Sequence, residues 1–211
     1  MSRLNISEKV CWSVKPLTEE LLKECFPFTC GLDSDMDSFF KKDAIAYTRF
    51  KMGVSYCACL DEDPRQIMAC FTLANDSLRI YDLPSSRRNM MWGISRHEKM
   101  LKRYPGVLLG RLAVSESFAR QGIGSQVLGF LKRWYRDFPE RAACRFLIVD
   151  AKNTPEVLAF YEKNGFEYLF SSEFQEDLYT KPATDEKERE LRKKNPRKLA
   201  TRLMFFDLIN L

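Results

Sequence analysis

The clearest chemical pattern in the chain is residues 112–125, Leu-Ala-Val-Ser-Glu-Ser-Phe-Ala-Arg-Gln-Gly-Ile-Gly-Ser. It predicts a strand that passes through a short turn into a helix, with Gly122 and Gly124 in the first helical turn. Glycine lets a phosphate group approach the backbone, and the first amides of a helix have no acceptor inside it. These amides, the helix dipole and Arg120 favour a pyrophosphate as ligand. The alternative is a structural glycine turn that binds nothing.

Two familiar nucleotide-binding patterns do not fit this turn. A dinucleotide fingerprint needs a third glycine where the sequence has Val127, and a P-loop needs a Gly-Lys-Ser/Thr run that is missing. We therefore exclude nicotinamide dinucleotides and nucleoside triphosphates as its ligands.

The residue types of metal and hydrolase sites are sparse. The seven cysteines include no Cys-x-x-Cys pair, and the one histidine, His97, lies in a polar, basic segment. We expect no bound metal and no catalytic triad. Cys57 and Cys59, two residues apart in a strand-like stretch, are interpreted as small buried apolar residues rather than as metal ligands.

The composition is that of a folded soluble protein. The 211 residues suffice for one well-filled domain, so we expect a single domain over residues 1–211. No apolar run is long enough to cross a membrane, and the first residues lack the pattern of a secretory signal. These features predict a cytoplasmic protein that does not insert into membranes.

The net charge of +5 is concentrated in two blocks of cations. One block lies in a basic loop or helix segment at about 81–105, and the other in a charged insertion at about 181–200 and just after it. An excess of positive charge favours an anionic ligand or a nucleic acid. The alternative is a solvated surface balanced by acidic neighbours. The cations are Arg87, Arg88, Arg96, Lys99, Lys102 and Arg103 in the first block, and Arg192, Lys193, Lys194, Arg197, Lys198 and Arg202 in the second.

Strands and helices alternate around the turn. Thr18 is expected to cap one helix, Thr154-Pro155 to start another, and Asn164-Gly165 to end it. Beyond Ile80 the pattern becomes irregular, and residues 186–198 are polar on all sides, as in an exposed helix or a mobile insertion. The strand-like segments are 10–14, 54–60, 66–74, 107–114, 146–149, 166–170 and 202–208, and the helix-like segments are 19–25, 33–47, 123–134 and 154–164.

Two motifs in this order resemble the GNAT superfamily of acyl-coenzyme A-dependent N-acetyltransferases. The turn resembles the superfamily's Arg/Gln-x-x-Gly-x-Gly/Ala signature, although Ala119 stands at its first position. About forty residues further on, Asn153 and the run 159–166, Ala-Phe-Tyr-Glu-Lys-Asn-Gly-Phe, resemble the second hallmark. The resemblance implies an α/β (α+β) fold with a mixed, mostly antiparallel sheet of about six to seven strands and helices on both faces. The sheet would be splayed between its fourth and fifth strands, here Leu108–Val114 and Arg145–Asp150.

The resemblance also implies where acetyl-CoA would bind. Main-chain groups of the strand would pair with the pantetheine arm, and amides of the turn would hold the pyrophosphate. Tyr161 would lie near the thioester sulfur. The residues implied are Leu112, Ala113, Val114, Arg120, Gln121, Gly122, Ile123, Gly124, Ser125, Asn153 and Tyr161.

Acyl transfer to an amine also needs a proton donor and a route to a neutral amine. The leaving thiolate has a conjugate acid pKa of about 8.5 if it behaves like cysteine, and the phenol of Tyr161 is the expected donor. The alternative for Tyr161 is packing. A general base is harder to find, and Glu116 and Asp150 are candidates by position. An α-amine, with a pKa of about 7.7–8.0, needs less help than lysine at about 10.4, which favours an α-amine as acceptor.

Residues 28–44 add a narrower resemblance. The pattern Phe-Thr-Cys-Gly-Leu-Asp-x-x-Met-Asp-Ser-Phe-Phe-x-x-x-Ala, with Leu109-Gly-Arg-Leu-Ala-Val114 and Val149-Asp-Ala151, resembles the GNAT branch that contains toxins acetylating aminoacyl-tRNA. The main expectation is acetyl transfer to a primary amine of a small molecule, peptide or aminoacyl group, with aminoacyl-tRNA as the alternative acceptor. The basic segments 87–103 and 192–202 would then bind tRNA, with Trp92 and Tyr104 stacking on bases. A non-catalytic coenzyme A sensor or nucleic-acid-binding module is the alternative from another class, and a homodimer is a further expectation.

Overall fold

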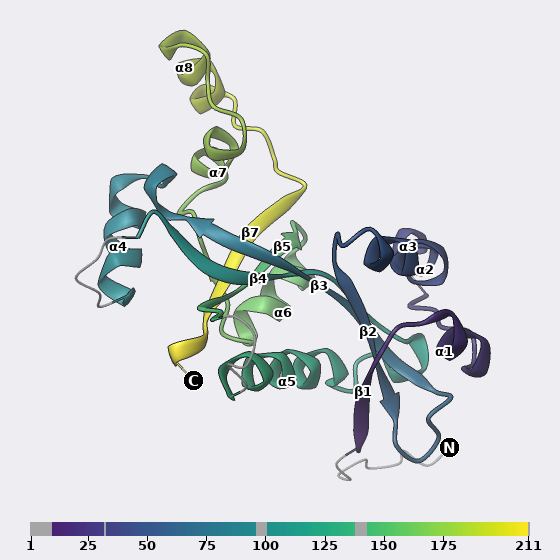
Figure 1. Cartoon of the computed structure of the whole chain (residues 1–211). Helices are drawn as coiled ribbons and strands as arrows, with labels where there is room; N and C mark the ends of the chain where they lie inside the picture. Colours follow the sequence, from purple (N-terminus) through teal and green to yellow (C-terminus); the bar gives the residue numbers. More distant parts are fainter. Residues whose placement is uncertain (1–9, 32, 96–100, 138–142, 211) are drawn as a thin grey trace. The chain divides into compact units, whose positions relative to one another are not determined.

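The computed structural model describes residues 10–31, 33–95, 101–137 and 143–210, which form two compact units. Unit 1 comprises Met1–Ala74 and Gly110–Phe130, and unit 2 comprises Asn75–Leu109 and Leu131–Leu211. Seven strands form a mixed sheet in the order β1-β2-β3-β4-β5-β7-β6. Figure 1 labels these strands with the exception of β6. The predicted fold class is confirmed. The single domain expected from the length stays a prediction.

Unit 1 is built on three antiparallel strands and the end of a fourth. Strand β1 (Trp12–Pro16) pairs antiparallel with β2 (Val54–Leu60), and β2 pairs antiparallel with β3 (Ile67–Arg79). Strand β3 begins in unit 1 and continues into unit 2. Its first seven residues are all buried because both faces of the strand are covered by protein.

Helices α1 to α3 cover one face of these strands. Helix α1 (Glu19–Glu24) begins at Thr18, whose hydroxyl accepts the amide of Leu21 at 3.1 Å, which confirms the predicted cap. The helix predicted over 33–47 is three segments: α2 (Ser34–Ser38), a π-helical turn η1 (Phe39–Asp43) and α3 (Ala44–Arg49). Their apolar side chains form one core with the sheet residues below, namely Phe28, Phe39, Phe40, Ala44, Cys57, Cys59, Cys70 and Ala113.

Unit 2 contains the parallel strand pair that distinguishes this sheet. Strand β4 (Arg103–Val114) runs parallel to β5 (Phe146–Lys152), and the register pairs Gly106 with Phe146 and Leu108 with Ile148. Among the described residues, the pairing of β4 with β5 ends at Leu108 and Ile148, although both strands continue beyond these residues. This is where the expected divergence of the fourth and fifth strands begins.

Strand β5 is covered on both faces. It pairs antiparallel with β7 (Thr201–Asp207), which also pairs with the two-residue strand β6 (Glu167–Tyr168). Side chains alternate along β5. Phe146 and Ile148 belong to the core that α4 (Ser85–Ser95) helps to form.

The remaining helices frame this part of the sheet. Helix α5 (Ile123–Asp137) runs from unit 1 into unit 2, and α6 (Pro155–Lys163) ends at Asn164 and Gly165 as predicted. Gly165 has a φ of 78°, which explains why glycine stands there. Among the described helices, none is long and apolar enough to cross a membrane.

The segment beyond Ile80, expected to be a basic loop or helix with an irregular pattern, contains the 3₁₀ turn η2 (Ile80–Asp82) and α4. One expectation about strands needs correction. The strand expected at 166–170 shrinks to β6, and an unpredicted helix, α7 (Glu173–Thr180), follows it. The buried face of α7 carries the carboxylate of Glu176, which accepts hydrogen bonds from Arg202 and from the amide of Leu203. Because this face is acidic, a pattern of apolar residues could not predict the helix.

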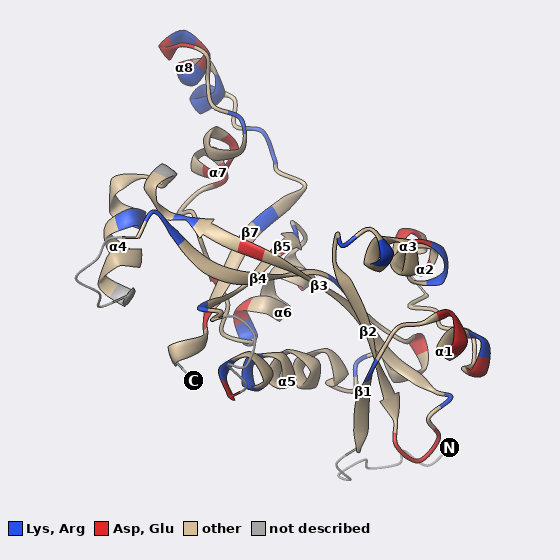
Figure 2. Ribbon diagram, in the orientation of Figure 1, with Lys and Arg blue, Asp and Glu red and all other residues tan. Residues whose placement is uncertain are grey.

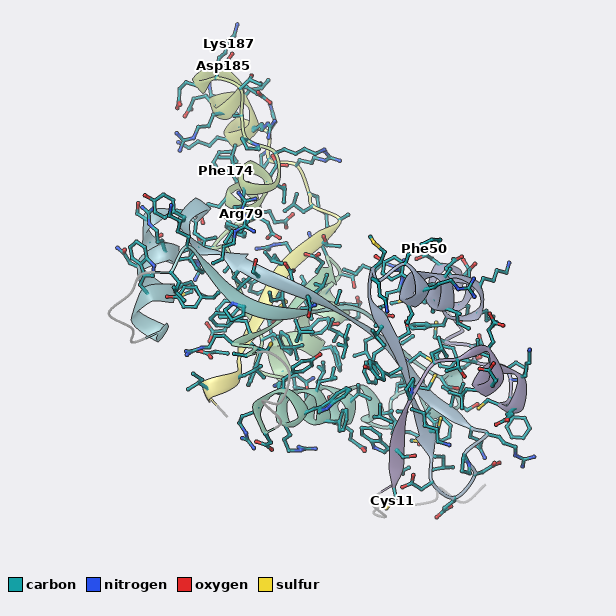
Figure 3. The ribbon with its side chains drawn as sticks, viewed as in Figure 1. Cys11, Phe50, Arg79, Phe174, Asp185 and Lys187 are labelled. Atoms are coloured by element: carbon teal, nitrogen blue, oxygen red, sulfur yellow. The ribbon has the colours of Figure 1, made fainter. Side chains whose placement is uncertain are left out.

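The charged insertion forms an exposed helix, α8 (Glu186–Lys194), as one of the two interpretations predicted. Asp185 caps it by accepting the amide of Glu188 at 2.7 Å. Figure 3 labels Asp185 and Lys187 at its first turn. Arg192 anchors the helix to α7 through Asp177, at 3.2 Å.

The close approach of β4 and β5 generates a stability prediction for Gly106→Ala. A Cβ atom at Gly106 would lie 2.6 Å from Cδ1 of the buried Ile148 and 3.0 Å from the carbonyl oxygen of Phe146. Such overpacking costs about 1–3 kcal/mol. We expect the free energy of unfolding, measured by urea denaturation, to fall by this amount.

Gly93→Ala is the matched control. Gly93 is exposed within α4, and a Cβ atom there meets nothing within 4 Å. Alanine favours a helix over glycine by about 0.8–1 kcal/mol, so this variant should be as stable as the wild type or more so. Equal unfolding midpoints for the two variants would contradict the described packing of β4 against β5.

Candidate active site

The turn between β4 and α5 has the backbone geometry of an anion-binding site. Arg120 has a φ of 61° and Gly122 a φ of 80°, so two left-handed residues lie two positions apart just before α5 begins at Ile123. Alternating conformations of this kind turn successive N–H groups toward one concave spot. A Cβ atom at Gly122 would meet nothing within 4 Å, so the turn is open on that side.

The side chains of the turn have distinct surroundings. Ile123 is buried and anchors the start of α5, so it can offer a ligand only its main chain. Gln121 is exposed and donates to the carbonyl of Ser117 at 3.0 Å. Arg120 is exposed and is the cation nearest in sequence to the glycines. Ala119, where the signature departs, carries no polar side chain and donates its amide to the Glu116 carbonyl at 3.2 Å.

The last residues of β4 alternate between two environments. Ala113 is buried in the core beneath α2 and α3, so Leu112 and Val114 lie on the opposite face of the strand. The strand ends at Val114, and the amide of the next residue, Ser115, donates to the carbonyl of Met68 on β3 at 2.8 Å. The pairing of these residues with a pantetheine arm stays a prediction.

A hydrogen-bond network from α2 supports the turn. Asp37 accepts from the Thr29 hydroxyl at 2.6 Å and from the Cys30 amide at 2.8 Å, and these bonds lower the pKa of the carboxyl group. The carbonyl of Thr29 accepts the amide of Glu116 at 2.9 Å. The Glu116 carboxylate lies against Gly31, 3.0 to 3.3 Å from the position of a Cβ atom there. The motif at 28–37 therefore fastens the start of the turn, a role the sequence did not reveal.

Tyr161 on α6 belongs to unit 2. Its side chain is 9% exposed, and burial raises the pKa of its phenol to about 12. The rings of Phe160 and Phe166 lie 5.1 and 5.3 Å from its ring, edge to face. A phenol with this pKa stays protonated at neutral pH, so Tyr161 is able to donate a proton and is unsuited to accept one.

A lysine that the sequence did not single out holds the end of the same helix. Lys132 on α5 donates to the carbonyl of Asn164, and its amine lies 3.6 Å from the centroid of the Phe206 ring. Burial lowers the pKa of this amine to about 8. The carbonyl groups at a helix end attract a cation, so Lys132 stabilises the end of α6. The only signal in the sequence is a lysine beside the apolar positions of α5.

Asn153 has hydrogen bonds that tie two segments of unit 2 together. Its side-chain amide donates to the carbonyl of Leu199 at 2.8 Å, and its backbone amide donates to Ala200 at 2.9 Å. These bonds connect the end of β5 to the chain entering β7. The contact with coenzyme A expected for Asn153 stays a prediction.

The two candidate bases differ in their surroundings. Asp150 on β5 has an exposed side chain, yet partial desolvation by the surrounding protein and the nearby charge of Asp76 raise its pKa. Glu116 lies against the loop at Gly31. A carboxylate with a raised pKa accepts a proton more readily, which favours Asp150 as a base. The catalytic role of either carboxylate stays a prediction.

Both basic blocks are partly engaged within the protein. Arg192 pairs with Asp177, and Arg202 pairs with Glu176 at 2.7 Å, so these two arginines serve the fold. Tyr104, expected to stack on bases, is buried against Phe146. Arg96 and Lys99 lie outside the described residues. Figure 2 shows the mixed charges of α8, and the exposed cations at and after its end are Lys193, Lys194, Arg197 and Lys198.

Comparisons with known proteins agree with this geometry. Residues 90–168 match the family described as acetyltransferase (GNAT) domain. A stretch of 103 residues is 31% identical to the uncharacterized N-acetyltransferase YesJ of Bacillus subtilis (strain 168). The match covers 49% of this chain and 52% of the relative, so the chain spans about half the length of that curated relative.

Solved structures match over nearly the whole chain. AtaT complexed with acetyl-methionyl-tRNAfMet is 20% identical, with a TM-score of 0.64 over 95% of this chain and 96% of that one. A mutant of KacT is 16% identical, with a TM-score of 0.64 over 94% and 96%. At these identities the likeness shows the fold. The chain therefore has the GNAT fold, and its residues 90–168 match the acetyltransferase (GNAT) domain family.

Proposed function

We propose that this protein is an N-acetyltransferase that moves the acetyl group of acetyl-CoA directly to a primary amine. The observation that carries the proposal is the open turn with left-handed Arg120 and Gly122 at the start of α5. The matches to a GNAT domain and to the N-acetyltransferase YesJ support it. A structure of AtaTR bound with AcCoA, of 20% identity, has the same fold.

In this proposal unit 1 holds the coenzyme. The amides of residues 121–125 bind the pyrophosphate, helped by the dipole of α5 and by the charge of Arg120. The main chain of Leu112 to Val114 pairs with the pantetheine arm as an added strand would. Acetyl-CoA supplies the thioester that is consumed, and no metal takes part.

Gly122→Ala tests the pyrophosphate site. The left-handed conformation costs a residue with a Cβ atom about 1–2 kcal/mol, so the turn should lose its concave shape. We expect the Kd for coenzyme A, measured by calorimetry, to rise roughly 10-fold, a factor that corresponds to about 1.4 kcal/mol. Binding of acetyl-pantetheine, which lacks the pyrophosphate, serves as the control. An equal loss for both ligands would contradict this assignment.

The chemistry proceeds by attack of the neutral amine on the thioester carbonyl. A C–N bond forms, the tetrahedral intermediate collapses, and the C–S bond breaks with its electron pair going to sulfur. The thiolate takes a proton from the phenol of Tyr161, and the amine gives up its proton to a base. Tyr161 is suited to this role because its raised pKa keeps it protonated.

Tyr161→Phe should lower kcat by about 10²–10⁴-fold, the usual effect of losing a general acid, and leave the affinity for coenzyme A unchanged. Because the Tyr161 pKa lies above its ordinary value, at about 12, deprotonation of the phenol should cause no loss of wild-type activity between pH 8 and 10. Thiol release from acetyl-CoA measures both effects. Tyr81→Phe, at an exposed tyrosine on η2, is the control. Full activity of Tyr161→Phe would refute the role of Tyr161.

Asp150→Asn tests the base. We expect kcat/KM near pH 7 to fall about 10²-fold or more, the lower end of the effect of general base catalysis. The loss should shrink at higher pH as the amine deprotonates by itself. Glu116→Gln is the comparison, and a larger effect there would move the assignment to Glu116.

Aminoacyl-tRNA is the second candidate acceptor. AtaT, whose structure was solved with acetyl-methionyl-tRNAfMet, shares the fold along nearly the whole chain, and cations at the end of α8 are exposed. An α-amine is also the easier nucleophile at neutral pH. A panel of simple amines and charged tRNAs assayed for thiol release separates the candidates. A protein that binds coenzyme A and releases no thiol with any acceptor would instead be a sensor or a binding module.

A further inference from the structure

Lys132 on α5 lies among the residues that end helix α6. Its amine donates to the carbonyl of Asn164, and it lies 3.6 Å from the centroid of the Phe206 ring and 5.4 Å from that of the Phe166 ring. The residue is 8% exposed, so these contacts enclose its charge. Lys132, its partners and Tyr161 all belong to unit 2.

The end of α6 is closed by its own backbone. Gly165, in its left-handed conformation, donates its amide to the carbonyl of Glu162 at 2.8 Å, and the amide of Phe166 donates to the carbonyl of Tyr161 at 3.0 Å. These two bonds form a Schellman motif, which satisfies carbonyl groups in the last turn of a helix. Termination of the helix therefore does not require the lysine at position 132.

The surroundings of Lys132 disfavour its charge. Burial lowers the pKa of the amine to about 8, which means that the charged form is less stable here than in water. At pH 7 most of the amine is nevertheless charged. A methionine side chain, of similar length, would fill the same space and would have no charge to desolvate. Stability of the fold therefore does not explain why a lysine stands at this position.

Lys132 contacts both parts of the structure that orient Tyr161. The Tyr161 ring packs edge to face on Phe166, 5.3 Å away, as residues at these two positions of a Schellman motif commonly do. The Phe166 ring in turn lies beside the amine of Lys132 and 5.8 Å from the Phe206 ring. Asn164, whose carbonyl Lys132 holds, donates its amide to the Tyr161 carbonyl at 3.0 Å. A shift of Asn164 or Phe166 would therefore turn the Tyr161 side chain.

We infer that Lys132 is a positioning residue that holds the phenol of Tyr161 in the orientation needed to protonate the departing thiolate. The inference rests on the proposed function, in which Tyr161 is the general acid. Proton transfer needs the two heavy atoms within about 2.6–3.2 Å, so a small rotation of the ring lowers the rate of the chemical step. In this role Lys132 acts through Asn164 and Phe166 and contacts no reacting group itself.

Lys132→Met keeps the length of the side chain and removes its amine. We expect kcat at pH 7, measured by thiol release from acetyl-CoA, to fall roughly 10- to 100-fold, because misplacing a catalytic group by about 1 Å costs up to 10²-fold in rate. The Kd for coenzyme A should not change, since the turn and strand proposed to bind it lie in unit 1. Lys132→Arg, which keeps the charge and the hydrogen-bond donors, should restore part of the lost kcat. A wild-type kcat for Lys132→Met would overturn the inference.

Lys163→Met is the matched control. Lys163 is an exposed residue in the last turn of α6, so this variant removes a lysine charge from the same helix end. It should keep the kcat of the wild type, and an equal loss in both variants would overturn the specific role of Lys132. Urea denaturation checks that each variant is folded. Lys132→Gln, which keeps a donor and loses the charge, takes the place of Lys132→Met if the latter does not fold.

A double-mutant cycle with Tyr161→Phe distinguishes a positioning lysine from a merely structural one. If Lys132 acts through the phenol, adding Lys132→Met to Tyr161→Phe should lower kcat by about 2-fold or less, because no phenol is left to position. Losses of kcat that multiply in the double variant would overturn the inference, since they would mean that Lys132 affects the rate by a route that bypasses Tyr161.

Nuclear magnetic resonance of protein with isotope-labelled tyrosine separates this inference from the proposed function. The Tyr161 signal, assigned by its absence from Tyr161→Phe, should shift in Lys132→Met and stay in place in Lys163→Met. A shifted signal together with full activity of Tyr161→Phe would overturn the proposed role of Tyr161 and leave Lys132 as the residue that orients its ring. An unmoved signal together with an inactive Tyr161→Phe would overturn the inference and leave the acetyltransferase standing.

Discussion

The carboxylate of Asp37 ties the N-terminal helices to the turn on which the candidate site depends. It accepts hydrogen bonds from the hydroxyl of Thr29 and the amide of Cys30, and Thr29 in turn accepts the amide of Glu116. Such a carboxylate keeps its charge because its bonds favour the ionised form. The turn that follows Glu116 then enters two left-handed conformations before α5. A backbone with this strain persists only where its surroundings hold it in place.

Unit 2 differs from unit 1 in the charged side chains that it buries. Glu176 and Asp207 lie almost fully inside the protein, and each is matched by an arginine, Arg202 and Arg145. A buried charge without a partner would cost several kcal/mol. The Glu176–Arg202 pair therefore fixes how α7 and β7 meet, and the Asp207–Arg145 pair fixes the end of β7 against the start of β5. Lys132 is a further partly buried charge with partners. At the end of α6 its amine donates to the carbonyl of Asn164 and lies over the rings of Phe166 and Phe206. The helix that carries Tyr161 is thereby held at its last turn.

The protonation states of the site residues follow from their burial. Tyr161 is buried beside phenylalanine rings, which makes ionisation costly and keeps the phenol protonated. Partial desolvation and the nearby charge of Asp76 raise the pKa of Asp150, so this carboxyl group also holds a proton more readily than usual. In the proposed reaction, Tyr161 as an acid that stays protonated and Asp150 as a base with a raised pKa would suit an amine whose own pKa is near neutrality. This pairing favours an α-amine over a lysine side chain.

The sequence by itself determined the order of strands and helices around the turn and the glycine at the end of α6, and its resemblance to the GNAT superfamily implied the fold class. The first two depend on local signals: periodic apolar residues, caps, and glycines that adopt left-handed conformations. The π-helical turn at Phe39, helix α7 and the surroundings of Lys132 were decided only by the tertiary structure. Helix α7 buries carboxylates against arginines distant in sequence, and the amine of Lys132 lies over a ring 74 positions after it (206 minus 132). Such contacts leave no periodic pattern, because the partners are set by how strands and helices pack and not by their spacing along the chain.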